Sequence, residues 1–395
     1  MMGTMGDTRF IGAAERRARL GVRHRLAGSA RAGSAAEVGD ALVALHGTDP
    51  ASVFLAVAAR LAEGVEPVGA VERALYEDGA LVRMHGMRHT VFVFPASLAA
   101  AVQASTTRPA AVRERTTLLK HLAAGSDFDE DWLAETERLV LAELAARGEA
   151  TGTELGAAVP RLRSTYVYGP GTRQEGPQSV ASRVLRVLGM EGRIVRGRPQ
   201  GTWTSSRFRW AVAGAHPVLD PARARAELLG HWLGACGPAT EADLTWWTGW
   251  KVTDVRKALV AVGALPVTVD EGTGFVLPDD LGAVPEPEPW AALLPALDPT
   301  AMGWQGRDWY LDPAHRAALY DRSGNIGPTV WWNGRIVGGW AQRPDGAVAH
   351  RLLADVGAEA ERAIGAEAVR LARWVGHVRV TPRFRTPLER ELSAG

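Results

Sequence analysis

The chain has 395 residues, which is too long for one compact core and predicts three or four domains. Its 45 basic and 44 acidic residues leave a net charge of +1, which excludes the strongly basic balance of a simple nucleic-acid binder. Any nucleic-acid surface must therefore be local. The first 33 residues, rich in arginine, are one place for it, with a solvated helix face as the alternative reading.

The cysteine content and the apolar runs bear on the compartment. Cys236 is the single cysteine, which excludes an intramolecular disulfide and suits a reducing cytoplasm. No apolar run approaches the roughly 18 residues needed to span a bilayer, and the N-terminus lacks the apolar region of a signal peptide. The sequence therefore predicts a cytoplasmic protein with no membrane partner.

Two helices are predicted on either side of a short polar stretch. The spacing of apolar residues predicts the first helix over residues 34–45, opened by a capping box of Ser34 and Glu37. Gly47 suits the position just past the end of this helix. A second helix is expected over residues 51–61. The stretch between them is thus predicted to be a tight helix-to-helix corner.

The corner places a base, a hydroxyl and a carboxylate within four residues, as His46, Thr48 and Asp49. Pro50 suits the first turn of the second helix, and Asp49 suits its N-cap. A fixed backbone there would aim all three polar side chains in one direction, which makes them candidates for catalysis. The alternative is structural: His46 as a cation near a helix C-terminus, and Asp49 as a cap alone.

Three segments share one order of predicted elements: a helix, a short turn, two further helices and a strand pair. Thr151 with Glu154, and Thr240 with Asp243, mark the start of the second helix in two of them. In the first segment the third helix is expected over residues 71–78. This order is that of a winged helix-turn-helix, a module used both for DNA binding and for protein scaffolding. The strand pairs are expected over residues 81–94, 193–212 and 265–277.

The rest of the chain departs from this repeat. Residues 166–178 are rich in glycine and proline and predict a loop inserted in the second segment. Beyond a proline-rich linker, residues 328–340 predict a hairpin with Asn333-Gly334 as its turn. A helix over 359–374 and a strand over 377–381 complete a small β-rich, barrel-like domain.

The predicted fold is therefore α+β, with tandem winged helix-turn-helix domains followed by a C-terminal β-barrel-like domain. The predicted domain boundaries are 1–125, 126–215, 216–284 and 285–395.

Common catalytic motifs are absent from the sequence. No metal-ligand spacing, phosphate-binding glycine loop or Gly-x-Ser-x-Gly elbow occurs, so we expect neither a metal nor a cofactor. His85 and His89 lie in the first strand pair, four residues apart, and are expected on one face of the hairpin. A hairpin tip is more often a contact with DNA or another domain than a metal site.

Several motifs together resemble the AlkZ-like DNA glycosylases, a winged-helix group whose bacterial members remove bulky alkylated bases and unhook interstrand crosslinks. The resemblance covers nearly the whole chain. It implies tandem winged helices and a C-terminal β-barrel, arranged as a C-shaped molecule around DNA. The motifs are Gly79-Ala-Leu-Val-Arg83, Gly86-Met-Arg-His-Thr90, Trp246-Trp-Thr-Gly249, Leu293-Leu-Pro-Ala-Leu-Asp-Pro299, and the Gly324-Asn325 and Pro328 to Trp340 stretch.

The resemblance also implies roles for the polar corner. The family's catalytic element is Gln-x-Gln or Gln-x-Asp, followed shortly by proline. Aligned on Pro50, His46 stands at the first glutamine and Thr48 at the second position, with Asp49 next. A carboxylate would stabilise the cationic sugar, and histidine and threonine would orient a water molecule. The expected DNA contacts are Arg83, His85, Arg88, His89, Arg161 and Arg163.

The implied activity is excision of alkylated purines, substituted at N7 and including bulky or crosslinked adducts, from double-stranded DNA. No lysine stands in the corner, so we expect a monofunctional, hydrolytic enzyme, acting as a nucleoid-associated monomer. The alternatives are a non-catalytic DNA-binding regulator or lesion sensor, and a scaffold without a DNA role. Salt-dependent binding to plain duplex would separate the scaffold from the other two.

Overall fold

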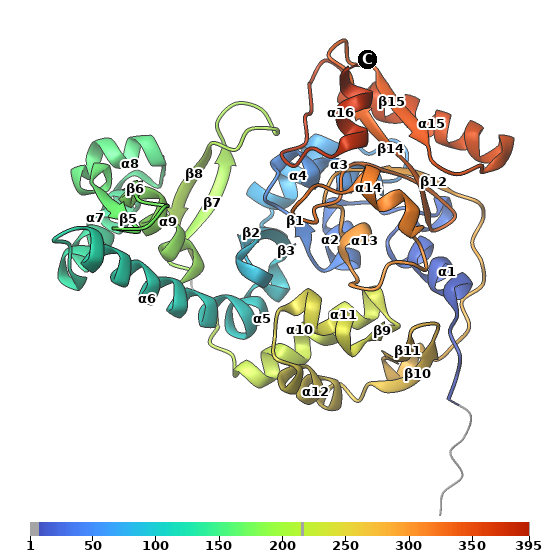
Figure 1. The fold of residues 1–395 in the computed structure, drawn as a ribbon, viewed down its shortest axis with the longest axis horizontal. Helices are drawn as coiled ribbons and strands as arrows, with labels where there is room; N and C mark the ends of the chain where they lie inside the picture. Colours follow the sequence, from blue (N-terminus) through green and yellow to red (C-terminus); the bar gives the residue numbers. More distant parts are fainter. Residues whose placement is uncertain (1–7, 215–216, 395) are drawn as a thin grey trace, which may run out of the picture.

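A computed structural model describes residues 8–214 and 217–394 of the chain. The fold is mixed α+β, with helices surrounding small antiparallel sheets (Figure 1). Within the described residues, no helix has both the length and the apolar character needed to cross a membrane.

The first of three similar units follows helix α1 (Ala13–Arg23) and is built around a three-stranded sheet. A hairpin supplies two of the strands, and its second strand, residues 91–95, lies in the middle of the sheet. The third strand is the two-residue segment Leu45–His46 between the first two helices, and it pairs with the other edge of the middle strand. The Ser34 hydroxyl accepts the backbone N–H of Glu37 and begins the first helix, as its predicted capping role requires. The elements are α2 (Ala35–Leu42), β1 (Leu45–His46), α3 (Pro50–Ala58), α4 (Pro67–Tyr76), β2 (Leu81–His85) and β3 (Val91–Pro95).

The second unit repeats this order after two connecting helices, α5 (Ala99–Val102) and α6 (Arg108–Gly125), which are joined by a π-helical turn over Gln103–Thr107. Thr151 and Glu154 form the predicted capping box. The predicted insertion loop is instead partly a hairpin, because strands β5 and β6 pair across it. The elements are α7 (Glu130–Arg147), β4 (Glu149–Thr151), α8 (Gly152–Ala158), β5 (Thr165–Tyr168), β6 (Gly176–Ser179), α9 (Val180–Met190), β7 (Ile194–Pro199) and β8 (Phe208–Val212).

The third unit has the same order and the same strand arrangement. Thr240 and Asp243 form its capping box, again as predicted. In each of the three sheets the middle strand is the last strand of the unit: β3, β8 and β11. The elements are α10 (Pro221–Cys236), β9 (Ala239–Thr240), α11 (Glu241–Thr248), α12 (Val252–Ala261), β10 (Leu265–Val269) and β11 (Gly272–Val276).

The C-terminal part holds a four-stranded antiparallel sheet in the order β12-β13-β14-β15. Asn333-Gly334 forms the predicted two-residue turn between β13 and β14, and both residues have positive φ. Helices α15 and α16 pack against this sheet. The elements are β12 (Ala291–Leu294), α13 (Pro299–Met302), α14 (Arg316–Leu319), β13 (Thr329–Trp332), β14 (Arg335–Gln342), β15 (Val348–Leu352), α15 (Gly357–Val375) and α16 (Pro387–Ala394).

Two C-terminal predictions were wrong. The sheet is open rather than barrel-like, since its outer strands β12 and β15 do not pair with each other in the described part of the chain. Residues 377–381 form no strand. The side chain of Gln342 bonds the backbone of this segment instead, donating to the Val378 carbonyl and accepting the Val380 N–H, so a side chain replaces the strand ladder.

One of the three repeated units has its own hydrophobic core, whereas the other parts of the molecule share theirs. The second unit has a hydrophobic core of its own and stands to one side of the rest in Figure 1. The first unit shares its cores with the third unit and the C-terminal sheet. Trp203, in the loop between β7 and β8, packs against Phe54 of α3 and Trp374 of α15, with ring centroids 5.3 and 5.7 Å apart. The second unit is therefore anchored at this loop as well as through α6.

A buried ion pair joins the first unit to the C-terminal part. Arg60 and Asp298 are both fully buried, and two guanidinium nitrogens bond the carboxylate at 2.7 and 2.9 Å. Arg60 also donates to the hydroxyl of Thr300, which lies 2.8 Å from Nδ1 of His24. Asp298 belongs to one of the motifs singled out in the sequence, and its role is to hold two parts of the fold together.

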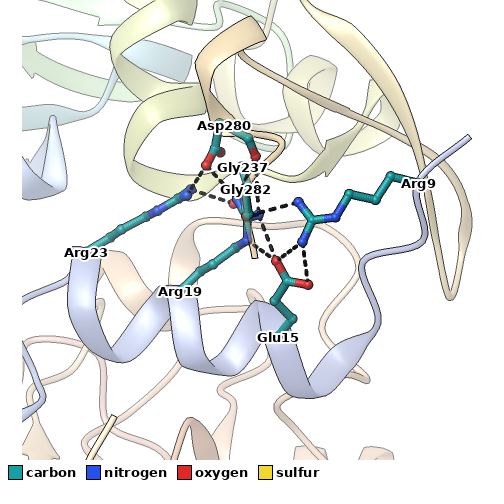
Figure 2. A network of polar contacts seen from close by, with 7 residues as sticks. All are labelled: Arg9, Glu15, Arg19, Arg23, Gly237, Asp280 and Gly282. Atoms are coloured by element: carbon teal, nitrogen blue, oxygen red, sulfur yellow. Dashed lines mark hydrogen bonds and ion pairs between the residues drawn. The ribbon is translucent and has the colours of Figure 1, made fainter. Parts of the chain in front are cut away.

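The N-terminal arginines are neither a free basic patch nor a solvated helix face. Figure 2 shows Arg19 and Arg23 of α1 turned towards Asp280, while Glu15 accepts from both Arg9 and Arg19. Arg19 is 1% exposed and also donates to the carbonyls of Asp280 and Gly282. These cations hold α1 against the third unit, so we remove them from the candidates for DNA contact.

Candidate active site

A tight turn between β1 and α3 carries the polar corner. His46 ends the short strand β1, where it stands opposite Phe92 of β3. The next residue, Gly47, donates its N–H to the Val91 carbonyl at 2.8 Å, and a Cβ on it would lie only 3.2 Å from the Phe92 carbonyl carbon. Glycine therefore suits this close backbone approach. The corner is fixed by the sheet at His46 and by the following helix.

The predicted helix over residues 34–45 ends three residues early. It stops at Leu42 because Val43 adopts a left-handed conformation with φ of 64°, after which the chain pairs with β3. His46 is thus a strand residue, and its expected position at a helix C-terminus was wrong. The corner joins a strand to a helix rather than a helix to a helix.

His46 lies at a hollow with an aromatic lining and one cation. Its ring meets Phe92 edge-on at 5.2 Å, and its Nδ1 is buried without a hydrogen-bond partner in the described structure. Burial, with a smaller contribution from the charge of Arg88, lowers the pKa of His46 to about 4, so the ring is neutral at neutral pH. A neutral imidazole offers one donor and one acceptor. The hollow is also lined by His24, Trp232, Cys236, Trp247 and Met302.

Asp49 does not share this hollow, which corrects the expectation that the three corner residues project together. One carboxylate oxygen accepts the N–H of Ala51 at 3.2 Å and caps α3; the other accepts the N–H of Arg383 at 3.0 Å. Arg383 also donates to the Thr48 carbonyl at 3.4 Å. Asp49 is 6% exposed and faces a separate hollow, lined by Pro295, Pro328, Trp340, Gln342, Val380 and Pro382.

Burial and the neighbouring donors shift the pKa of Asp49 in opposite directions. Burial raises the pKa of this carboxyl, while the N–H groups of Arg383 and Ala51 and the nearby arginine charges lower it. The carboxylate is therefore a buried acceptor for two parts of the backbone. Its observed contacts position the corner and the C-terminal loop.

Three arginines, Arg83, Arg196 and Arg383, gather behind the corner. Arg83 of β2 donates to the Gly47 carbonyl at 2.8 Å, and its guanidinium lies 4.8 Å from the ring centre of Phe208. Arg196 of β7 lies over the same ring at 5.5 Å. Burial, followed by the charges of Arg83, Arg383 and a further arginine, lowers the pKa of Arg196 to about 10. In residues 8–214 and 217–394 none of the three forms an ion pair with a carboxylate.

Of the four predicted DNA contacts in the first hairpin, two are exposed at its tip and two are buried in its first strand. Arg88 and His89 are exposed, and both have the left-handed backbone rare for residues other than glycine, with φ of 52° and 60°. Arg83 and His85 are 3% and 6% exposed. His85 and His89 therefore do not share one face of the hairpin, as the sequence suggested, and only the tip is open to solvent.

The predicted contacts in the second unit differ in how they are held. Arg161 is half-buried, with its guanidinium 5.4 Å from the ring centre of Trp132 and one nitrogen 3.4 Å from the Trp132 carbonyl. Arg163 is exposed. Both lie in a short 3₁₀ turn over Pro160–Arg163, away from the corner and next to the β5–β6 hairpin.

The sequence was compared with models of protein families. The family described as DNA glycosylase AlkZ-like matches residues 40–374, which is most of the chain and includes the corner and all four structural parts. The chain belongs to the AlkZ-like DNA glycosylase family.

Solved structures agree with this assignment at the level of the fold. The DNA glycosylase AlkZ of Streptomyces sahachiroi superposes with a TM-score of 0.68 at 23% sequence identity, covering 93% of this chain and 98% of that one. No match was found between the chain and the curated proteins. The AlkZ-like membership predicted from the motifs is thus confirmed, and it makes DNA the partner of the family's site.

Sequence reasoning missed several residues at this AlkZ-like site. Arg383 reaches Asp49 across 334 positions of sequence, and no local pattern announces that contact. Arg196 lies in a strand pair that was predicted, but the sequence gave no sign that it faces Arg83. Trp246 was also missed; its backbone carbonyl accepts from Arg88, which lines the hollow at His46. Trp246 had one available signal, since it opens a motif used for the resemblance.

Proposed function

We propose that this DNA glycosylase excises alkylated purines, those substituted at N7, from double-stranded DNA by hydrolysis. The observation that carries the proposal is His46, a neutral imidazole with an unpartnered buried nitrogen at an aromatic hollow. It stands where the family has a glutamine. Like an amide side chain, a neutral imidazole can both donate and accept a hydrogen bond.

The chemistry needs little help at the leaving group. Alkylation at N7 gives the purine a positive charge, so the bond from C1′ to N9 breaks with its electron pair moving to the base, which leaves neutral. The sugar becomes an oxocarbenium ion, water adds to C1′, and a proton passes to solvent. With a pKa of about 4, His46 is a weak base, and we assign it to orienting this water.

Thr48 and Asp49 take different roles in the proposal. Thr48 is half-buried two residues after His46 on the same turn, and we assign its hydroxyl to holding the same water. Asp49 has both oxygens occupied by backbone N–H groups, so we assign it to positioning the corner rather than to contact with the sugar. Its negative charge still lies on the same turn as the reacting groups.

A covalent lysine intermediate has no candidate here. The chain contains three lysines, Lys120 in α6 and Lys251 and Lys257 at α12, and none of them lines the hollow at His46. The proposed enzyme is therefore monofunctional and leaves an abasic site.

The DNA-binding part of the proposal rests on the three repeated units. Their order of helices and hairpins supports three tandem winged helices, and we propose that they and the C-terminal sheet surround duplex DNA as a C-shaped monomer. Among the predicted contacts, Arg88, His89, Arg161 and Arg163 remain accessible to phosphates. We assign the buried Arg83 to holding the corner.

The test is incubation of the full chain with duplex containing one N7-methylguanine, followed by alkaline cleavage of any abasic site. Strand cleavage at the modified position supports the proposal. Salt-dependent binding to the duplex without base release would instead indicate a non-catalytic DNA-binding protein, in which the replacement of the family's glutamines by His46 and Thr48 has removed the activity.

A further inference from the structure

A half-exposed tryptophan lies between two arginines beside the candidate active site. Trp246 of α11 has the guanidinium carbon of Arg88 4.3 Å from its ring centre, and that of Arg307 5.0 Å from it. Arg88 comes from the tip of the first hairpin, and Arg307 from the loop after α13. We call these three residues the Arg–Trp–Arg stack. It brings together the first unit, the third unit and the C-terminal part.

The backbone is shaped to place Arg88 in this stack. Arg88 has a left-handed φ of 52°, a conformation that costs energy for a residue with a side chain. Its Nη1 donates to the Trp246 carbonyl at 2.7 Å, near the C-terminal end of α11, where the helix dipole favours a cation. Gly249 ends that helix, and a Cβ there would lie 3.3 Å from the Arg88 side chain. The strained tip and the glycine together let the guanidinium approach the indole.

Arg307 is held in place by neutral groups. Its Nε donates to the Trp304 carbonyl at 2.9 Å, and Nη1 donates to the Tyr320 hydroxyl at 2.9 Å. Among the residues that the structure describes, Nη2 contacts only the thioether of Met302, at 3.9 Å, which is a weak acceptor. These contacts fix the direction of the guanidinium and leave its charge uncompensated.

The stack places two positive charges side by side, and the neighbouring Asp243 carboxylate accepts the N–H groups of Gln305 and Gly306 rather than either guanidinium. Neither Arg88 nor Arg307 forms an ion pair with a carboxylate in the described ranges 8–214 and 217–394. Burial, and then the nearby charge of Arg307, lowers the pKa of Arg88. By contrast, buried Arg60 has Asp298, and exposed Arg316 has Asp308 at 2.6 Å. Two adjacent, oriented and unpaired guanidinium groups are suited to binding an anion.

The stack adjoins the hollow at His46. Arg88 lines that hollow together with His46 and Phe92, and Met302 lies both in the hollow and against Arg307. An anion on the stack would therefore lie next to a nucleotide whose sugar faced His46.

We propose that the Arg–Trp–Arg stack binds backbone phosphate of the DNA strand that carries the target nucleotide, with Arg307 as a direct phosphate contact. The proposal rests on the proposed function for its choice of DNA as the source of the phosphate. Trp246 keeps the two guanidinium groups apart and aimed, so the contact positions any DNA sequence without reading its bases.

The experiment measures binding of the full chain to undamaged duplex over a series of salt concentrations. Each phosphate contact adds about 0.9 to the slope of log affinity against log salt on duplex DNA. Arg307→Gln keeps a polar, hydrogen-bonding side chain but removes the charge, so its slope is expected to fall by about 1. Arg307→Lys keeps the charge and should retain most of the slope. Arg316→Gln is the matched control and should bind like the wild type, because Arg316 already has an acidic partner.

A purely structural role for Arg307 predicts another pattern. In that case Gln and Lys would lower the free energy of unfolding alike, and neither would change the salt slope; that result overturns the proposal, as does a wild-type slope for Arg307→Gln. Base release from N7-methylguanine duplex is read separately. Wild-type protein that binds with the predicted Arg307 dependence but releases no base would leave the stack standing and refute the glycosylase assignment. Base release by the wild type, together with an unchanged salt slope for Arg307→Gln, would refute the role of the stack and leave the glycosylase assignment standing. Absence of salt-dependent binding by the wild type would refute both.

Discussion

Replacing Asp49 with asparagine separates the two roles considered for this residue. Asp49 accepts one backbone N–H with each oxygen, from Ala51 and from Arg383. Asparagine has one acceptor oxygen, so its NH₂ group must face the second N–H, and one buried bond is lost with its donors unpaired. The expected cost is about 1–3 kcal/mol in the free energy of unfolding. Urea denaturation of the wild type and the variant measures it directly.

Asp129 provides the matched control. It is an exposed N-cap of α7 and accepts a single N–H, that of Trp132, at 2.8 Å. Asparagine caps helices about as well as aspartate, so Asp129→Asn should leave stability unchanged within roughly half a kcal/mol. A clear loss for Asp49→Asn and none for Asp129→Asn would show that the loss comes from the buried, doubly bonded site of Asp49 and not from helix capping.

The rate of excision also distinguishes the two roles considered for Asp49. Removing a charge that directly stabilises the transition state costs on the order of 10²–10³-fold, whereas a positioning residue should cost about tenfold or less while the protein stays folded. Single-turnover excision at a temperature where Asp49→Asn is fully folded distinguishes them. A hundredfold loss of rate with unchanged stability would instead indicate that the Asp49 carboxylate contacts the sugar directly.

Three further outcomes are expected. Single-turnover excision by the wild type should stay level from about pH 8 to pH 5, because the pKa of His46 is about 4; a decline centred near the ordinary histidine value of about 6.5 would contradict this. The free energy of unfolding should fall as the pH drops from about 6.5 towards 4, since the unfolded chain takes up protons that the folded His46 and His24, with pKa values of about 4 and about 3, exclude. Urea denaturation over that range checks the sign, and His46→Gln should make the fall less steep. Asp298→Ala should lower the free energy of unfolding by about 3–5 kcal/mol, because it leaves Arg60 buried without its partner. The double variant that also carries Arg60→Met should recover part of this loss, and no recovery would mean that the unpaired charge is not its cause.

The sequence predicted best those features that depend on neighbouring residues. The capping boxes at Thr151 and Thr240 and the Asn333-Gly334 turn are confirmed, because each is a bond or a backbone conformation within four residues. The three strand pairs were placed correctly for the same reason, since each hairpin pairs residues close in sequence.

Features set by distant contacts were predicted poorly. Helix α2 ends at Leu42 because the following residues pair with β3, about fifty positions later, and helical spacing cannot show that. The same limit applies to the orientation of Asp49, which is decided by Arg383. The N-terminal arginines looked available in the sequence, yet one of the two acids that bind Arg19, Asp280, lies 261 residues away. A site assembled from several units can therefore be located by its motifs, but the direction of its side chains requires the fold.

In the proposed mechanism His46 orients the attacking water, and single-turnover release of N7-methylguanine from duplex DNA measures that role. The wild type, His46→Ala and His46→Gln are to be compared at saturating protein, after urea denaturation has shown that each is folded. We predict release by the wild type, a loss on the order of 10²-fold for alanine, and recovery of most of the rate by glutamine, which restores a neutral donor and acceptor. Equal rates for His46→Ala and the wild type would show that His46 takes no part in orienting the water.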